Sequence, residues 1–353
     1  MRKLLHGADF HMDSPFSGLT PEAALERRRQ QRLLPGLLAE HCLRQRCDAV
    51  VLAGDLFDSA RVTPESVEAL AAGLEACAVP VFIAPGNHDP AAELSPWRKN
   101  CWPGNVHIFL GGWEAVTMET LGLRVWGAAF QGAAEPAKLG RAADDGLLEV
   151  GVLHGDPVYP ALPETVTREA IAESGLQYLA LGHIHRPQLP LRAGHTWYAW
   201  PGVAMGRGFD ETGEHGFLAV TVSDGDCRGE FLPLPGPQYV ELEAVAGDDP
   251  FRAAAEAIGQ AHRDDFVRLT LTGEAAAVDT EALRRALERC CRSLTVLDET
   301  VPPRALWDEA GTGSLRGIAL SRLEAACHNG DGAAADAARY LLAALEGRDA
   351  PWS

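Results

Sequence analysis

The chain has 353 residues, and at roughly 150 residues per domain this length favours two domains. Apolar residues make up 46% and charged residues 23%, an ordinary globular mixture that excludes a collagen-like chain, a coiled coil and a disordered tail. The net charge of −18 excludes a protein that holds nucleic acid by bulk electrostatic attraction, so a phosphate-bearing substrate has to be attracted locally.

The sequence also favours a cytoplasmic protein. No apolar run reaches the ~18 residues that a membrane span needs. His6 and Asp9 interrupt the short apolar stretch at the N-terminus, so we expect no secretion signal. The eight cysteines form no Cys-x-x-Cys pair, and we interpret them as free thiols in a reducing compartment with no part in the chemistry.

Short apolar runs followed by polar side chains recur along the first part of the chain. They occupy 4–8, 50–54, 81–86, 150–153 and 178–182, and the residues that follow them are Asp9, Asp55, Asn87, His154 and His183. Runs of this length that are rich in Val, Ile and Leu predict buried strands. Helices are predicted over 21–47, with a break near Pro35, and over 64–77. This alternation predicts a layered α/β domain whose functional groups collect beyond the carboxyl ends of the strands.

The second part of the chain changes character. Short antiparallel strands are expected between 105 and 130, and two more strands over 196–200 and 217–222. The Pro-rich segment 232–237 predicts a linker. A compact α+β module is expected after it, with strands over 239–245, 266–272 and 293–297 and helices over 250–262 and 280–291. One or two helices, interrupted near 329–332, are expected from 313 to 347. Their apolar stripe either packs on this module or docks a partner.

The polar residues at the predicted strand ends are of the types that bind metal ions. Asp9 and His11 are two positions apart, as are His183 and His185, and in an extended strand end this spacing places both side chains on one side. A single histidine is more often a hydrogen-bonded core residue, but a group at five strand ends favours a metal site. The seven donors are Asp9, His11, Asp55, Asn87, His154, His183 and His185.

Nitrogen and oxygen donors without a thiolate suit Mn, Fe or Zn and argue against a structural zinc site. Seven donors exceed one tetrahedral site and predict two metals about 3.5–4 Å apart. Asp55 follows Gly54 on a tight turn and is the expected bridge. Two such ions provide a hydroxide at neutral pH and clamp the attacking and leaving oxygens, which is the chemistry of phosphoester hydrolysis.

Five motifs resemble those of the calcineurin-like metallophosphoesterases, in the same order. They are Asp9-x-His11, Gly54-Asp55-x-x-Asp58, Gly86-Asn87-His88-Asp89, His154-Gly155 and Gly182-His183-x-His185. The resemblance covers residues 1 to about 230 and implies an α/β/β/α sandwich. It implies one metal on Asp9, His11, Asp55 and His185 and another on Asp55, Asn87, His154 and His183. It also implies that His88 stabilises the pentacoordinate phosphorus and assists the leaving oxygen, with Asp58 orienting it.

Two further stretches, 9–16 and 201–216, resemble the SbcD/YhaO-like branch of DNA repair exonucleases, although His215 stands where that branch generally has a basic residue. The resemblance implies a nuclease domain at 1–235, an α+β capping domain at 238–300 and a C-terminal helical segment at 311–347 for partner docking. It further implies manganese as the metal and an SbcC-like coiled-coil ATPase as the partner. Homodimers are common in that branch, but the sequence itself predicts no interface.

The first hypothesis is therefore a manganese-dependent DNA exonuclease, a hydrolase of DNA repair, with exonuclease and endonuclease action both left open. Arg61, Arg186 and Arg207 fall near the predicted metal end and are the candidates for DNA contact, although a solvated surface role is the more common one for any single arginine. The alternative is a small-molecule nucleotide phosphodiesterase, which the metal motifs alone leave open. A non-catalytic scaffold ranks last, because every ligand and His88 are present.

Overall fold

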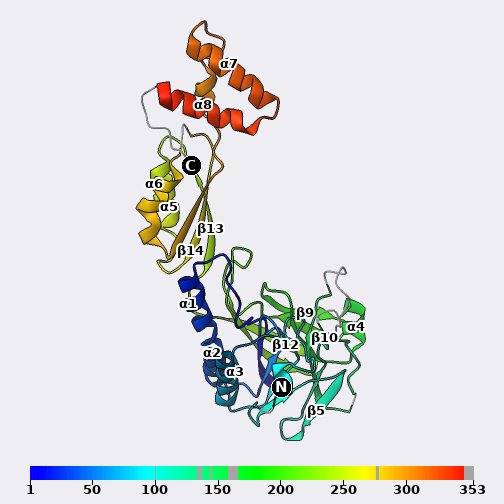
Figure 1. Cartoon of the computed structure of the whole chain (residues 1–353). Helices are drawn as coiled ribbons and strands as arrows, with labels where there is room; N and C mark the ends of the chain where they lie inside the picture. Colours follow the sequence, from blue (N-terminus) through cyan, green and yellow to red (C-terminus); the bar gives the residue numbers. More distant parts are fainter. Residues whose placement is uncertain (100, 133–136, 144, 158–165, 276–277, 346–353) are drawn as a thin grey trace. The chain divides into compact units, whose positions relative to one another are not determined.

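The computed structural model describes residues 1–99, 101–132, 137–143, 145–157, 166–275 and 278–345. The chain divides into two compact units, Met1–Pro235 and Gly236–Ser353 (Figure 1). Within the described residues, no helix combines the length and the apolarity that crossing a bilayer requires.

The first unit begins with a mixed sheet of six strands in the order β12-β11-β1-β2-β3-β4. Three parallel strands match the predicted apolar runs: β1 (Arg2–Gly7), β2 (Ala49–Leu52) and β3 (Val81–Ile83). Strand β4 (Val106–Ile108) is parallel to β3, so the antiparallel strand expected at this position is wrong. The hairpin of β11 (Gly216–Ser223) and β12 (Asp226–Pro233) completes the sheet, with β11 antiparallel to β1. Parallel pairing places the carboxyl ends of β1, β2 and β3 at one edge.

Helices cover the outer face of this sheet. The predicted helix over 21–47 is two helices, α1 (Pro21–Gln31) and α2 (Leu34–Gln45), and α3 (Pro64–Ala76) follows β2. Leucines of α2 and α3 pack on alternate strand residues such as Leu5 and Val50. The intervening strand residues, such as Leu4 and Val51, face the opposite way, into the core between the two sheets. This period of two is what a strand imposes on its side chains.

The second sheet has the order β5-β6-β7-β8-β10-β9. Its strands are β5 (Glu114–Met118), β6 (Leu123–Gly127), β7 (Leu148–His154), β8 (Tyr178–Gly182), β9 (Gln188–Ala193) and β10 (Thr196–Trp200). The four central strands are parallel, and the edge strands β5 and β9 run antiparallel to their neighbours. The short helix α4 (Arg168–Glu173) contributes Ile171 to the core on the outer face of this sheet.

The buried faces of the two sheets form one apolar core. Leu4 and Phe82 of the first sheet belong to the same cluster as Val125, Val150 and Tyr178 of the second, and all five are essentially inaccessible to solvent. The α/β sandwich predicted for this unit is confirmed.

The second unit contains a small parallel sheet, β13-β14-β15, formed by Tyr239–Val245, Phe266–Thr272 and Ser293–Asp298. Helices α5 (Pro250–Ile258) and α6 (Thr280–Leu287) pack on it around Leu269 and Leu283. Helices α7 (Leu315–His328) and α8 (Gly332–Leu345) have an apolar cluster of their own, centred on Leu320 and Ala338.

Single 3₁₀ turns occur in both units. They lie at Pro96–Arg98 and Glu119–Leu121 in the first and at Glu288–Cys290 and Arg304–Trp307 in the second.

Some element boundaries differ from the predictions. The helices expected over 250–262 and 280–291 end at Ile258 and Leu287. Strand β9 was not predicted because it is an exposed edge strand that contains Pro190, and β12 was not predicted because polar residues interrupt its apolar pattern. Since β12 extends to Pro233, the linker is shorter than the predicted 232–237. Residues 346–347 of the predicted C-terminal segment lie outside the described residues.

Candidate metal centre

The predicted site residues lie in loops with an unusual backbone. Strand β1 ends at Gly7, and the chain then places Asp9 and His11 in the left-handed region, at φ values of 53° and 45°. Asp55 and His183 adopt the same region, at 51° and 94°. The extended geometry expected for the Asp9/His11 and His183/His185 pairs is therefore wrong. Left-handed turns bring the side chains together, and aspartate and histidine tolerate such turns better than most residues do.

Backbone hydrogen bonds join the loops that follow β1 and β2. The N–H groups of Asp9 and His11 donate to the carbonyl oxygens of Gly54 and Asp55, both at 3.0 Å. At the end of β8, Gly182 lies against β2, and a Cβ atom there would be 2.0 Å from the carbonyl oxygen of Ala53. Only glycine allows this approach, which brings the strand ends of the two sheets together.

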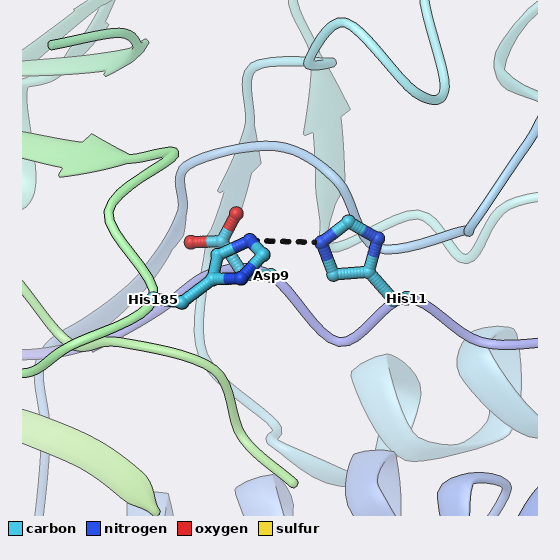
Figure 2. Close-up of side chains that lie close together, drawn as sticks. All are labelled: Asp9, His11 and His185. Carbon is cyan, nitrogen blue, oxygen red and sulfur yellow. Dashed lines mark hydrogen bonds between the residues drawn. The ribbon is translucent and has the colours of Figure 1, made fainter. Parts of the chain in front are cut away.

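The first group of donors consists of Asp9, His11 and His185, whose ligand atoms lie within 4.8 Å of one another (Figure 2). The Nε2 atoms of His11 and His185 are 3.3 Å apart. Two nitrogens that each lie ~2.0–2.1 Å from one cation are separated by about this distance. The spacing therefore fits two imidazole ligands of a single ion.

The second group consists of Asp9, Asp55 and His154, all three buried. The Nε2 atom of His154 lies 3.3 Å from Oδ2 of Asp55 and 2.9 Å from Oδ1 of Asn87. The ring of His183 stands edge-on to that of His154, with centroids 5.2 Å apart. All seven donors that the sequence singled out thus gather at one edge of the sandwich.

Asp55 joins the two groups. Its Oδ2 atom lies 3.3 Å from Nε2 of His154 and 3.9 Å from Nε2 of His11, which belong to different groups. The other oxygen, Oδ1, accepts the backbone N–H of His88 at 2.9 Å. A carboxylate between two sets of donors has the geometry of a bridging ligand.

The electrostatics of the site suit a cation. Burial raises the pKa of Asp9 to about 7, and the neighbouring charge of Asp55 acts in the same direction. Burial lowers the pKa of His11 to about 4 and also lowers that of His183, so both imidazoles are neutral at pH 7 and retain a lone pair for a metal. Burial alone would lower the pKa of His154, but the Asp55 carboxylate raises it to about 9. Two buried carboxylates with the neutral imidazoles of His11 and His183 form a donor set that fits divalent cations, whereas His154 has to release a proton before it can bind one.

His88 is exposed beside these groups, with its ring edge-on to that of His11 at 4.8 Å between centroids. Its Nδ1 atom lies 2.9 Å from the backbone carbonyl oxygen of Asp58. A carbonyl only accepts hydrogen bonds, so Nδ1 carries the proton and Nε2 is the atom free to exchange one. The contact with Asp58 therefore involves its main chain. The carboxylate of Asp58 accepts instead from Ser14 Oγ at 2.8 Å and from Arg207 at 3.0 Å.

Asp89 holds the loops after β2 and β3 together, a role that the sequence analysis did not assign. Its buried carboxylate accepts four backbone N–H groups, from Asp55 at 3.2 Å, Leu56 at 2.8 Å, Phe57 at 3.2 Å and Gly86 at 2.8 Å. In the sequence, this anchoring role is indicated only by the position of Asp89 as the last residue of the Gly-Asn-His-Asp motif.

The three arginines named as candidates for DNA contact lie in different environments. The side chains of Arg61 and Arg186 are exposed. The Arg207 side chain is only 22% exposed and is directed at two protein carboxylates, those of Asp58 and Glu211. Glu211 was not among the predicted site residues, and it contacts His185 as well.

A calcineurin-like phosphoesterase superfamily domain model matches residues 3–225, which extend from β1 to the end of β11 and include every residue of the site. The chain belongs to this superfamily. The phosphoesterase is 33% identical over 295 residues to the uncharacterized metallophosphoesterase YhaO of Bacillus subtilis, a match that covers 78% of this chain and 70% of YhaO.

Two further relatives are more distant. The phosphoesterase is 26% identical to the DNA double-strand break repair protein Mre11 of Aeropyrum pernix, over 70% of this chain and 64% of that protein. It is 24% identical to a subunit of the nuclease SbcCD of Rhodobacter capsulatus, over 86% of this chain and 88% of that protein. Membership makes the chain a metal-binding hydrolase of phosphoesters, and its donor groups fit two divalent ions.

Proposed function

We propose that this phosphoesterase is a metal-dependent DNA exonuclease that acts in DNA repair and uses manganese. The position of Asp55 between His11 and His154 is the observation that carries the phosphodiesterase part of the proposal. The DNA part rests on the two relatives whose names describe a repair protein and a nuclease.

In this proposal the donors divide into two sets that share Asp55. One set is Asp9, His11, Asp55 and His185, and the other is Asp55, Asn87, His154 and His183. When bound, the two cations supply a nucleophile from water at neutral pH and offset the charge of the phosphate. The chain's part is to hold the donors in place through the left-handed loops and the Asp89 hydrogen bonds.

His88 acts on the substrate and is not a ligand. Its Nδ1 atom is fixed on the carbonyl of Asp58, which leaves Nε2 to hold a proton at the position that faces solvent and substrate. We infer that Nε2 donates this proton to the leaving oxygen, and in its charged form it also offsets negative charge at the phosphorus. General acid catalysis of this kind contributes roughly 10²–10⁴-fold to a rate.

A second protein completes the function in this proposal. The net charge of −18 disfavours tight DNA binding by this chain alone, and the exposed Arg61 and Arg186 provide only local positive charge. An SbcC-like coiled-coil ATPase is the proposed partner, docked on α7, where Leu315 and Ile318 are 84% and 48% exposed. A homodimer and a cytoplasmic location belong to the same proposal.

A nuclease assay tests the proposal. Purified protein with Mn²⁺ is incubated with end-labelled linear DNA, with closed circular DNA and with small cyclic and simple phosphodiesters, and His88→Ala serves as the control. We expect degradation of the linear DNA alone, lost in the variant. Cleavage of the circular DNA would replace exonuclease by endonuclease action. Turnover of only the small phosphodiesters would overturn the DNA assignment in favour of a nucleotide phosphodiesterase.

Two observations favour the small-molecule alternative. Arg207, the candidate closest to the donors, is directed at protein carboxylates, and the whole chain is strongly acidic. A small phosphodiester needs fewer positive contacts than a DNA strand does.

A further inference from the structure

Each of the two histidines in the first donor group has a carboxylate next to its Nδ1 atom, on the side of the ring away from the other histidine. Nδ1 of His185 lies 2.8 Å from Oε1 of Glu211, and Nδ1 of His11 lies 3.4 Å from Oδ1 of Asp58. The opposite nitrogens of the two rings, both Nε2, face each other at 3.3 Å. Each ring therefore presents one nitrogen to a carboxylate and the other to the proposed metal position.

Arg207 links the two carboxylates. Its NH1 group donates to Asp58 at 3.0 Å, and its Nε group lies 3.1 Å from both oxygens of Glu211. The backbone N–H of Arg207 donates to Glu211 as well, at 2.9 Å. A planar guanidinium that bridges two carboxylates fixes the orientation of both, which a lysine could not do in the same way.

The loop that carries Glu211 and Arg207 is itself anchored. The buried Arg27 donates to the carbonyl oxygen of Gly206 at 2.6 Å, and Nε2 of His215 lies 3.1 Å from the carbonyl oxygen of Glu211. The Glu211 side chain is 3% exposed. A buried carboxylate in a fixed loop is a rigid support for the imidazole that it contacts.

We propose that Glu211 is a positioning residue for the metal centre, and that Arg207 extends its effect to Asp58 and His11. Glu211 accepts a hydrogen bond from Nδ1 of His185, which selects the tautomer with a lone pair on Nε2 and fixes the plane of the ring. Arg207 thus orients the two carboxylates that lie next to the Nδ1 atoms of His11 and His185, and it is not a contact for DNA. This inference rests on the proposed function, since it needs a metal at the first donor group.

His154 provides an internal contrast. Its Nδ1 atom lies 2.9 Å from the backbone carbonyl oxygen of Ala53, so a neutral group supports it and the Glu211–Arg207 pair does not reach it. The support is therefore specific to one of the two proposed ions. Loss of Glu211 is expected to weaken the first metal and to leave the second in place.

Binding of Mn²⁺ in the absence of substrate tests the inference. Titration calorimetry of the full chain compares the wild type with Glu211→Gln, which keeps the size of the side chain and removes its charge. Glu214→Gln, an exposed glutamate in the same loop, is the matched control. We expect one of two Mn²⁺ sites to weaken by about 10–100-fold in Glu211→Gln, which is typical for the loss of such a partner. Circular dichroism in EDTA reports whether each variant is folded.

The outcomes separate this inference from the proposed function. A wild type that binds fewer than two Mn²⁺ ions overturns the metal assignment itself. Two ions bound equally tightly by the wild type and by folded Glu211→Gln overturn only the role of Glu211. If Glu211→Gln does not fold, Glu211→Asp decides, because it keeps the charge and draws it back from His185, and full affinity in a folded Glu211→Asp would overturn the role of Glu211. Arg207→Gln leaves the contact between Glu211 and His185 intact and tests the bridge to Asp58 separately. We expect a smaller loss at the same site, and unchanged affinity in Arg207→Gln would contradict the bridge to Asp58.

Discussion

The backbone N–H of His183 donates to the carboxylate of Asp9 at 3.1 Å, although 174 residues separate the two positions in the chain. Asp9 follows β1 of one sheet and His183 follows β8 of the other. The hydrogen bond therefore spans the two layers of the sandwich at the edge where the donors gather. The metal centre is a property of the folded pair of sheets, and no single segment contains it.

Asp55→Asn is expected to reduce metal content at both positions and to abolish hydrolysis while the chain stays folded. The substitution keeps the shape of the side chain but removes the charge that lies between His11 and His154. Metal analysis of the purified protein, together with circular dichroism, measures both effects. A folded variant that retains two ions would show that Asp55 is not the bridge.

His88→Ala is expected to lower kcat by about 10²–10⁴-fold, because the variant has no group to protonate the leaving oxygen. Metal content should not change, since His88 is outside both proposed ligand sets and its hydrogen bond to Asp55 comes from the backbone N–H, which the variant keeps. His195→Ala, which removes an exposed imidazole elsewhere, is the control. Turnover equal to that of the wild type would refute the catalytic role of His88.

Asp89→Ala is expected to destabilise the first unit by about 3 kcal/mol or more. The variant leaves four buried backbone N–H groups without their acceptor, and a buried unsatisfied polar group costs about 1–3 kcal/mol. Urea denaturation measures the loss. Glu93→Ala removes an exposed carboxylate from the same loop and should have little effect. Equal stability of the two variants would argue against the anchoring role.

The stability of the protein should depend on pH through His6. Burial in the core lowers the pKa of His6 to about 3, and its Nδ1 atom lies 2.8 Å from the Tyr178 hydroxyl. Between about pH 6.5 and pH 3 the unfolded chain binds a proton at this position and the folded chain does not, so acid favours unfolding. The loss in the free energy of unfolding is absent above about pH 6.5 and grows by roughly 1.4 kcal/mol for each pH unit below that value, down to about pH 3.

His6→Gln removes this titration. The free energy of unfolding, measured in urea at pH 7.5 and pH 5, should therefore fall less in the variant than in the wild type. His262→Gln, at a surface position, is the matched control and should behave as the wild type does. An equal fall in wild type and His6→Gln would mean that His6 is not the buried neutral group described above.

The sequence was sufficient to predict where the donors gather, and the reason is topological. Asp9 and Asp55 follow strands of one sheet and His154 ends a strand of the other, and parallel pairing takes the strand ends within each sheet to one edge. The local conformation was not predictable in the same way. Side chains alternate in direction along a strand, and this rule suggested an extended backbone at Asp9 and His11. Hydrogen bonds to the loop that follows β2 hold both residues in left-handed turns instead.

The support around the site was the hardest part to predict. Glu211 lies in a loop without a regular pattern, and only the folded chain brings it to His185. The same loop turns Arg207 toward Asp58, whereas the sequence alone suggested an arginine that faces a substrate. A charged side chain near a predicted site has many accessible partners, and the choice among them is made by tertiary packing.

The left-handed loops have a consequence for the stability of this chain. Asp9, His11, Asp55 and His183 are four of the eight non-glycine residues with positive φ in the part of the chain that the structure describes. Each such residue holds about 1–3 kcal/mol of conformational energy that the core must offset. The side chains that form the proposed metal centre are therefore held at a cost in stability, which glycine at the same positions would reduce only by removing the donors themselves.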